Sequence, residues 1–280
     1  MLVKNLINEY VKILAKSRSY IGIGALTVLI LLIIFAMKAD GESILSFATA
    51  SFEQTLSFSG NILNGNLIAY IVLQMLIVHV PLLIALVTGD LLSGEAAMGT
   101  IRMLATKPIS RTKIVLSKFI AGSSYVLVIV LWMGFLAVIL SGWLFGKGDL
   151  IVLNSDGLII LKGADVSWRF MAGFVVAFLA LLTVSSLSLC LSAFAENSIG
   201  PIVSTMAIII LFTIIGTLDV TIFDSIKPYL FTTHMASWRS FFEDPVDWRS
   251  IWESIIILVV HNVLFLLVAL WKFNRKDITS

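Results

Sequence analysis

Residues 20–37 read YIGIGALTVLILLIIFAM, a run of 18 residues without a charged side chain. A helix needs about 20 mostly apolar residues to cross the hydrocarbon core of a bilayer, where an unpaired backbone group finds no water. Five comparable runs follow, and the six predicted spans are residues 20–37, 67–88, 119–140, 171–191, 201–218 and 255–271. The sequence therefore predicts an all-α integral membrane protein, with residues 1–280 forming one transmembrane domain.

The composition agrees with this class. Hydrophobic residues make up 59% of the chain and charged residues 13%, against roughly 45–50% and 25% in soluble globular proteins. We therefore exclude a soluble enzyme or a nucleic-acid-binding protein, and we expect membrane lipid as a partner. Cys190 is the single cysteine, so the chain can build neither an internal disulfide nor a cysteine-based metal site.

Charge is distributed unevenly between the two faces. With the N-terminus inside, the cytoplasmic segments hold 12 of the 19 basic residues but 5 of the 17 acidic ones. Basic residues are enriched on the cytoplasmic side of membrane proteins. The sequence thus predicts a multi-pass protein of the cell (plasma) membrane, of bacterial type, with both termini cytoplasmic.

Residues 1–19 have the pattern of an amphipathic helix lying on the membrane. Lys4, Asn8, Lys12 and Lys16 recur every four residues, and apolar side chains fill the opposite side. This periodicity is typical of interfacial helices. The alternative is a plain basic flank that orients the first span.

The connection over residues 89–118 is too long for a tight turn. We expect a short helix over 95–105, with Ser93 as its N-cap and Glu95 in its first turn. Pro108 would end this helix, and Ser110 would cap the next one. The alternative is a basic loop that only sets topology.

The other connections differ in length. The one before the fifth span is short, which predicts a helical hairpin. Residues 38–66 and 141–170 read as polar outer loops. Residues 219–254 are long, acidic and aromatic, and we expect one or two short outer helices there that dip partway into the membrane, because unstructured loops of this length are uncommon; a disordered loop is the alternative.

Motifs for chemistry are missing from the sequence. It contains no G-x-x-x-x-G-K-[ST], H-E-x-x-H or G-x-S-x-G pattern, so it predicts no ATP-binding loop and no catalytic residues. His79, His234 and His261 have no carboxylate at ligand spacing, so we expect no metal site either.

A few polar residues lie within the predicted spans. Gln74 and His79 in the second span fit a substrate pathway and helix packing equally well, because polar groups in lipid must face protein or water. The serine-rich face of the fourth span fits close helix packing. Since the spans contain no Asp or Glu, ion-coupled transport is disfavoured.

The stretch between the second and third spans resembles the ABC type-2 permease family, the membrane subunits of exporters with type V architecture. The resemblance rests on Gly94-Glu95, on Gly99-Thr100-Ile101-Arg102, on Lys107-Pro108-Ile109-Ser110-Arg111 and on Lys118. It covers the whole chain only as a topology: an N-terminal amphipathic helix, six spans and a long outer connection before the last.

The resemblance implies a coupling helix that docks on a separate ATPase, and an elbow helix at residues 1–19. The ATPase-coupling residues would be Glu95, Gly99, Thr100, Ile101, Arg102, Pro108 and Arg111. The implied partners are two soluble ABC ATPase subunits, which would bind ATP and Mg, and a second permease copy, identical or not. A substrate route between the copies would pass spans two and five, with Gln74 and His79 as candidate lining residues, and this chain itself would hold no cofactor and be no enzyme.

Two other functions remain open from the sequence. One is a secondary carrier or channel that works without ATP, and the other is a membrane assembly factor without transport activity. A mostly apolar route with few polar groups favours an amphiphilic or hydrophobic cargo over a small hydrophilic one.

Overall fold

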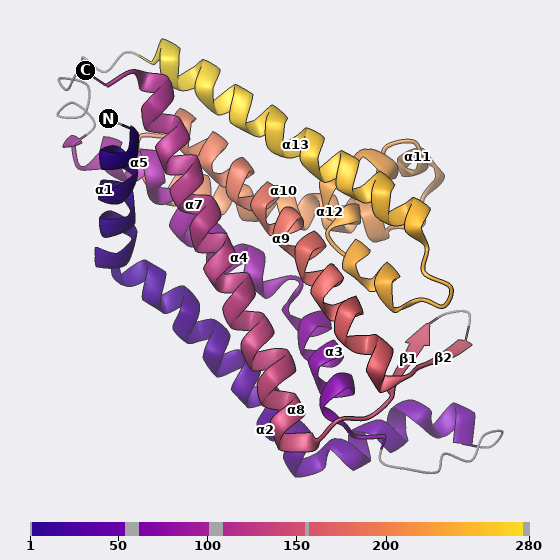
Figure 1. Cartoon of the computed structure of the whole chain (residues 1–280). Helices are drawn as coiled ribbons and strands as arrows, with labels where there is room; N and C mark the ends of the chain where they lie inside the picture. The colour runs from indigo at the N-terminus through magenta and orange to yellow at the C-terminus, as the bar shows by residue number, and fades with distance from the viewer. Residues whose placement is uncertain (1, 54–61, 101–108, 155–156, 277–280) are drawn as a thin grey trace.

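The computed structural model describes residues 2–53, 62–100, 109–154 and 157–276 as a bundle of long helices (Figure 1). Among these residues, six helical stretches are long and apolar enough to cross a membrane, which confirms the predicted number. They are Ser17–Gly41, His79–Ala97, Arg111–Phe145, Gly163–Phe194, Ile199–Thr217 and Trp248–Arg275. The structure is thus that of a multi-pass helical membrane protein.

The first span is the beginning of α2 (Ser17–Glu53), which follows the N-terminal helix α1 (Leu2–Ala15). The backbone of α2 kinks at Asp40, where φ is −143° and ψ is 23°, and helix continues beyond the kink. The expectation of a loop over 38–66 is therefore wrong for residues 38–53. Residues 54–61 lie outside the described part.

The second span is not one helix but several segments, which corrects the predicted span over 67–88. It consists of α3 (Gly65–Leu76) and α4 (His79–Thr88), with a break at residues 77–78. Pro81 explains the break, because proline has no N–H to bond the carbonyl four residues earlier and disfavours helix in the residue before it. Gly89 has helical dihedral angles, so α4 runs on into α5 (Asp90–Ala97).

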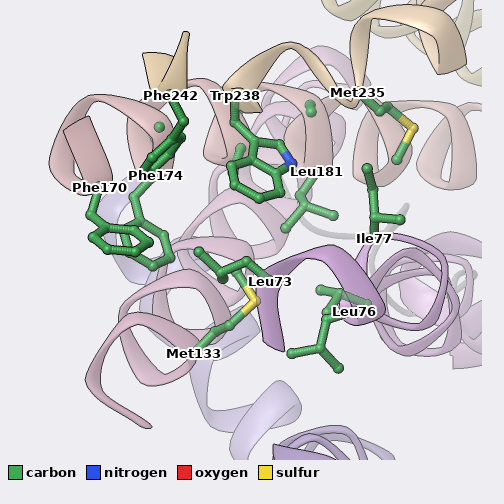
Figure 2. Close-up of a pocket in the computed structure, with 14 residues that line it drawn as sticks. Leu73, Leu76, Ile77, Met133, Phe170, Phe174, Leu181, Met235, Trp238 and Phe242 are labelled. Atoms are coloured by element: carbon green, nitrogen blue, oxygen red, sulfur yellow. The ribbon is translucent and has the colours of Figure 1, made fainter. Parts of the chain in front are cut away.

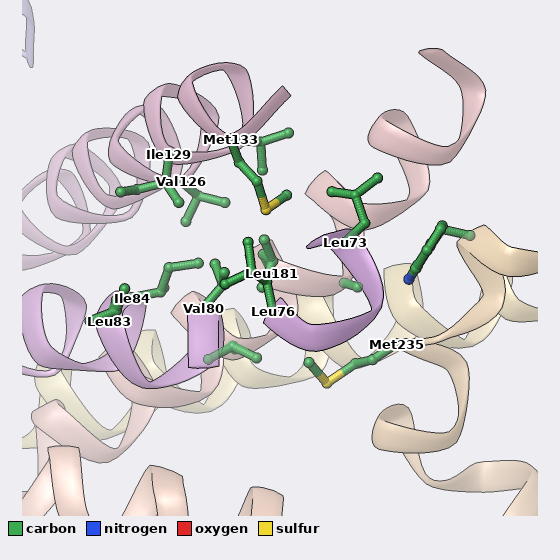
Figure 3. Close-up of a cluster of buried hydrophobic side chains, with 14 of the residues drawn as sticks. Leu73, Leu76, Val80, Leu83, Ile84, Val126, Ile129, Met133, Leu181 and Met235 are labelled. Carbon is green, nitrogen blue, oxygen red and sulfur yellow. The ribbon is translucent and has the colours of Figure 1, made fainter. Parts of the chain in front are cut away.

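Side chains of several helices pack around this break. Figure 3 shows Leu73 and Leu76 of α3 and Val80 of α4 beside Met133 and Leu181. All five are buried. The helices on both sides of the break are therefore packed into the core, although Val78 at the break is exposed.

The third span joins α7 (Arg111–Gly134), the π-helix η1 (Phe135–Leu140) and α8 (Ser141–Phe145). Two antiparallel strands follow, β1 (Leu150–Asn154) and β2 (Gly157–Leu161), with Leu150 opposite Leu161. This hairpin lies where we expected a polar loop, so the fold departs from all-α there. Its runs of Leu, Ile and Val are too short to span a membrane and favour strands.

The last three spans are α9 (Gly163–Phe194), α10 (Ile199–Thr217) and α13 (Trp248–Arg275). In their most apolar windows, 61% of α9 is buried, but 17% of α10 and 22% of α13. α9 lies inside the bundle, and it packs closely on α13 through hydrogen bonds from Asn262 Nδ2 to Thr183 Oγ1 (2.7 Å) and from Ser186 Oγ to Asn262 Oδ1 (2.6 Å). The serine-rich face of the fourth span thus packs between helices, as expected.

Of residues 219–254, the last seven belong to α13, and the part before them contains four short helical segments. These are α11 (Thr221–Asp224), η2 (Lys227–Tyr229), α12 (Phe231–His234) and η3 (Ser237–Phe242). Phe231 is fully buried, and its ring lies 5.8 Å from that of Phe212 and 6.1 Å from that of Phe265. Phe265 is about 26 Å along α13 from its first residue, so the segment folds back deep between the helices.

α1, α5 and the last turn of α13 lie at one end of the bundle (Figure 1). The first turns of α7 and the last turn of α9 belong to this end, because Arg111 bonds the end of α13 and Lys276 bonds the end of α9. We call it the charged end. It is the end that the sequence predicts to be cytoplasmic.

Candidate functional site

Four charged side chains meet inside the charged end, and we call them the charge cluster: Glu9 and Lys12 of α1, Glu95 of α5 and Lys118 of α7. Lys118 Nζ lies 2.8 Å from Glu9 Oε2 and 2.8 Å from Glu95 Oε1. Lys12 Nζ lies 2.8 Å from Glu9 Oε1 and 2.5 Å from Glu95 Oε1. Two carboxylates and two ammonium groups thus neutralise one another and join three helices.

Three of the four side chains in the cluster are nearly free of solvent, and the fourth, Lys12, is 33% exposed. The side chains of Glu9 and Lys118 are each 1% exposed, and that of Glu95 is 4% exposed. A charge at such a depth is stable only when it is paired. α1 is therefore held to α5 and α7 by groups that none of these helices could bury alone.

A second group of ion pairs borders the cluster. Asp90 of α5 lies 2.5 Å from Lys16 Nζ and 3.0 Å from an Arg18 nitrogen. A Cβ on Gly94 would lie 2.3 Å from the Asp90 carboxylate. The glycine therefore leaves room for Asp90 to turn toward the start of α2.

The cluster shifts the pKa values of its two α1 members. Burial alone would raise the pKa of Glu9, but the attraction of Lys118 and Lys12 outweighs burial and holds that pKa below its ordinary value. Burial would lower the pKa of Lys12, but hydrogen bonds to Glu9 and Glu95 outweigh it and raise that pKa. Both groups are therefore held in their charged forms.

The polar face of α1 points partly into the protein. This corrects the expectation of a helix whose polar residues all lie on the side away from its packed, apolar residues. Lys4 and Asn8 are exposed, but Lys12 and Lys16 turn toward carboxylates. Asn5, also buried, donates to Ser117 Oγ at 2.5 Å. Ile13 is buried, but four apolar side chains of α1 are exposed: Val3, Ile7, Val11 and Leu14.

The predicted helix over 95–105 is wrong in its start. Glu95 lies in the last turn of α5, and Ser93 lies inside that helix, with its hydroxyl donating to the Gly89 carbonyl. Helix α5 ends at Ala97 because Gly99 has φ +69°, a conformation that glycine adopts readily after a helix. Thr100 donates to the Glu95 carbonyl at 3.3 Å.

Three predicted coupling residues, Ile101, Arg102 and Pro108, lie outside the described residues. Ser110 caps α7 as predicted, since its hydroxyl accepts from the Lys113 N–H. Arg111 donates to the carbonyls of Asn274 (2.9 Å), in the last turn of α13, and of Lys276 (2.7 Å), which directly follows that helix. The stretch over 101–108 is therefore flanked by two residues that are each bound to other helices, Glu95 and Arg111.

Lys276 extends these contacts to α9. Its ammonium group donates to the carbonyl of Ala195 at 3.1 Å. A cation at the C-terminus of a helix is favourable because it meets unpaired carbonyls and the negative end of the dipole. Through Arg111 and Lys276, the charged end thus joins α7, α13 and α9.

The two candidate route residues lie on either side of the break in the second span. Gln74 of α3 is half-buried and hydrogen-bonds the Tyr70 side chain. His79 of α4 is exposed, with its Nδ1 2.9 Å from the Met75 carbonyl. Gln74 thus bonds within α3, whereas His79 bonds across the break to α3, so the two side chains have different partners.

Ile77 and Val78, between these two residues, line the nearest large cavity, which has a volume of about 540 Å³. It lies against α10, α12 and η3, with Arg239 in its wall. Sequence reasoning missed this cavity and the partnering of Glu9 with Lys118. Within the described ranges, no three His, Cys, Asp or Glu side chains gather as a metal site.

These features define a helical multi-pass membrane protein with an ion-paired cluster at one end and an apolar cavity between its helices. The chain belongs to the family described as "Protein of unknown function (DUF2705)", whose model matches residues 23–279. It is similar to "Uncharacterized protein YhcI" of Bacillus subtilis (strain 168), with 23% identity over 199 residues. That match covers 70% of this chain and 63% of the relative, so the chain spans less than two thirds of the relative's length.

Proposed function

We propose that this chain is the membrane-spanning subunit of an ATP-driven exporter, and that it works as a dimer with two separate ATPase subunits at the charged end. The carrying observation is that residues 101–108 are flanked by Glu95 and Arg111, both fixed to other helices. A push on this connection by an ATPase would be passed to α7 through Lys118 and to the end of α13 through Arg111. The membrane is the cell membrane, and both termini face the ATPases.

The burial of Glu95 changes the role that we propose for it. A side chain that is 4% exposed and bound to two lysines transmits movement rather than touching the ATPase. The docking surface would instead include Gly99 and the half-buried Thr100, just beyond the end of α5, together with Ile101 and Arg102. Pro108 would separate this surface from α7.

The N-terminal helix supports the same proposal. Its exposed apolar side chains, Val3, Ile7, Val11 and Leu14, would lie in the lipid interface, and its polar face is fixed to α5 and α7. α1 would then act as an elbow that keeps the charged end at the membrane surface. This placement accounts for a helix that exposes its apolar face to the surroundings of the protein.

Purification tests the proposal directly. The tagged chain is expressed with its neighbouring reading frames and purified in mild detergent, and we expect a stoichiometric partner that carries G-x-x-x-x-G-K-[ST]. Thr100→Cys in a Cys190→Ser background should crosslink to that partner, whereas Lys147→Cys, between α8 and β1, should not. Substrate movement by the chain alone in liposomes without ATP would instead support a secondary carrier and overturn the proposal.

A further inference from the structure

The cavity of about 540 Å³ has one apolar and one polar side. Its apolar wall comes from the break at Ile77 and Val78 and from α10, including Met206 and Ile209. Arg239 and the hydroxyl-bearing Thr232 line it from η3 and α12. Its volume falls within the roughly 300–1,000 Å³ of small-molecule sites.

Two polar atoms of these side chains have no hydrogen-bond partner within the described chain. Arg239 Nε and Thr232 Oγ1 are both buried and make no hydrogen bond. The guanidinium carbon of Arg239 lies 5.9 Å from the centre of the Trp238 ring. An unpaired buried donor is costly, and Arg239 is the one charged residue among those that line the cavity, so this wall calls for an acceptor from outside the described residues.

A smaller pocket adjoins the apolar wall of the large cavity. Ile77 and Met235 line both the large cavity and this smaller pocket. In Figure 2 they lie at the edge of a cluster of rings and aliphatic side chains. The smaller pocket holds no charged side chain, so the Arg239 wall is where a polar group would bind.

We propose that this cavity binds an amphiphile with one acidic head group and one hydrocarbon chain. Arg239 and Thr232 donate hydrogen bonds to the head-group oxygens, and the chain lies along α10 toward Ile77. A guanidinium matches phosphate or carboxylate oxygens by charge and shape. Only the claim that this amphiphile is the transported substrate rests on the proposed exporter role. Binding of the amphiphile to the cavity requires no ATPase.

Binding is measured with dodecyl phosphate on the purified chain in phosphatidylcholine nanodiscs. We expect saturable binding that raises the unfolding temperature, because a ligand of the folded state stabilises it. Arg239→Gln should weaken binding at least about tenfold, since a charge-assisted hydrogen bond is lost, and Arg239→Lys should lie between. Without ligand, Arg239→Gln should unfold at or above the wild-type temperature, because Arg239 Nε makes no hydrogen bond that the change would remove.

Two further variants keep the test specific. Arg249→Gln is the matched control, because the Arg249 side chain is 89% exposed and pairs with Glu253, and it should bind dodecyl phosphate normally. Thr213→Phe places a ring in the wall where we expect the hydrocarbon chain, and it should weaken binding. Unchanged binding in Arg239→Gln, or equal competition by neutral dodecyl maltoside, would overturn the proposal.

The acidic amphiphile could be a resident membrane lipid or a transported molecule, and the lipid of the nanodisc separates them. If phosphatidylglycerol occupies the site, discs that contain it should suppress dodecyl phosphate binding in the wild type. If the occupant is a single-chain cargo, phosphatidylglycerol should leave binding unchanged. The binding assay contains no ATPase. A failure to find an ATPase partner would therefore leave the binding result valid, and a failure of binding would leave the exporter proposal valid.

Discussion

Replacing Lys118 with methionine tests whether the charge cluster fastens the charged end. The Lys118 ammonium lies 2.8 Å from both Glu9 and Glu95, and its side chain is 1% exposed. Methionine has a similar length and is apolar, so the change removes the charge without leaving a large cavity. Two buried carboxylates would then share Lys12 alone.

The magnitude follows from burial. Removing one partner of a buried ion pair costs about 3–5 kcal/mol. Lys12 stays 2.8 Å from Glu9 and 2.5 Å from Glu95, but its side chain is 33% exposed, so it compensates only in part. We expect Lys118→Met to lower the free energy of unfolding by about 3 kcal/mol, at the low end of that range.

A double mutant separates charge imbalance from lost packing. Glu9→Gln together with Lys118→Met restores one carboxylate against one ammonium group, so the double variant should be about 1–3 kcal/mol more stable than the two single effects predict when added. Denaturation of the purified protein in mixed micelles measures all three variants. Arg249→Met is the control, because its pair with Glu253 is 89% and 59% exposed and should contribute at most about 1 kcal/mol. The reasoning would be refuted if the unfolding free-energy changes of the two single variants simply added in the double variant. It would also be refuted if Lys118→Met lowered the unfolding free energy no more than Arg249→Met does.

The same cluster sets a pH dependence. Because the pKa of Glu9 is lowered in the fold, its stabilisation is complete above its ordinary value of 4.5 and is lost as the pH falls through the folded value. Because the pKa of Lys12 is raised, its stabilisation is complete below 10.5 and is lost as the pH rises through the folded value. A spin label at Val11 in a Cys190→Ser background should show α1 docked between pH 4.5 and pH 10.5, and mobile once the pH passes the folded pKa of Glu9 or of Lys12. A label that stays equally mobile at every pH would contradict the docking.

Two glycines give sharper local tests. Gly94→Ala puts a Cβ 2.3 Å from the Asp90 carboxylate, so it should displace Asp90 from Lys16 and lower the unfolding free energy by about 1–3 kcal/mol; micelle denaturation checks this, and a neutral effect would disprove the contact. Gly65→Ala puts a Cβ 2.5 Å from the Gly142 backbone, which cannot rotate away, whereas Gly142→Ala meets nothing within 4 Å. Only the Gly65 variant should lose stability, and equal effects in the same assay would mean that α3 and α8 are not in backbone contact.

The number of spans could be predicted from the sequence because apolar length alone decides it. The break in the second span was harder to see, because hydropathy averages over residues 77–78 and a proline in an apolar run either kinks or ends a helix. The end of α5 depends on the positive φ of Gly99, which a glycine permits but does not require. Ser93 misled for a related reason, since a serine inside a helix can bond its own backbone instead of capping.

The charge cluster was hidden because its members lie on three separate segments. Lys118 was counted among the basic residues that orient the protein, and Glu9 was counted as an acidic residue of the inner face. One signal was present: Asn5, Glu9 and Lys12 share a helix face, and Lys118 adjoins an apolar run where an unpaired charge is costly. Arg239 offered no such signal, since only the tertiary fold places it beside α10.

The charge cluster and the cavity lie at opposite ends of the continuous helix formed by α4 and α5. This arrangement gives a last prediction. From His79 to Ala97, α4 and α5 run on through 19 residues, about 28 Å, and the break next to His79 lines the cavity. If movement of Glu95 is carried along this helix, Lys118→Met should change the affinity for dodecyl phosphate severalfold, although Lys118 does not line the cavity. Gly65→Ala, which disturbs α3 instead, serves as the control for general loss of stability. Equal affinity in wild type and Lys118→Met would mean that the two sites do not bias the same element, since coupling requires that both do.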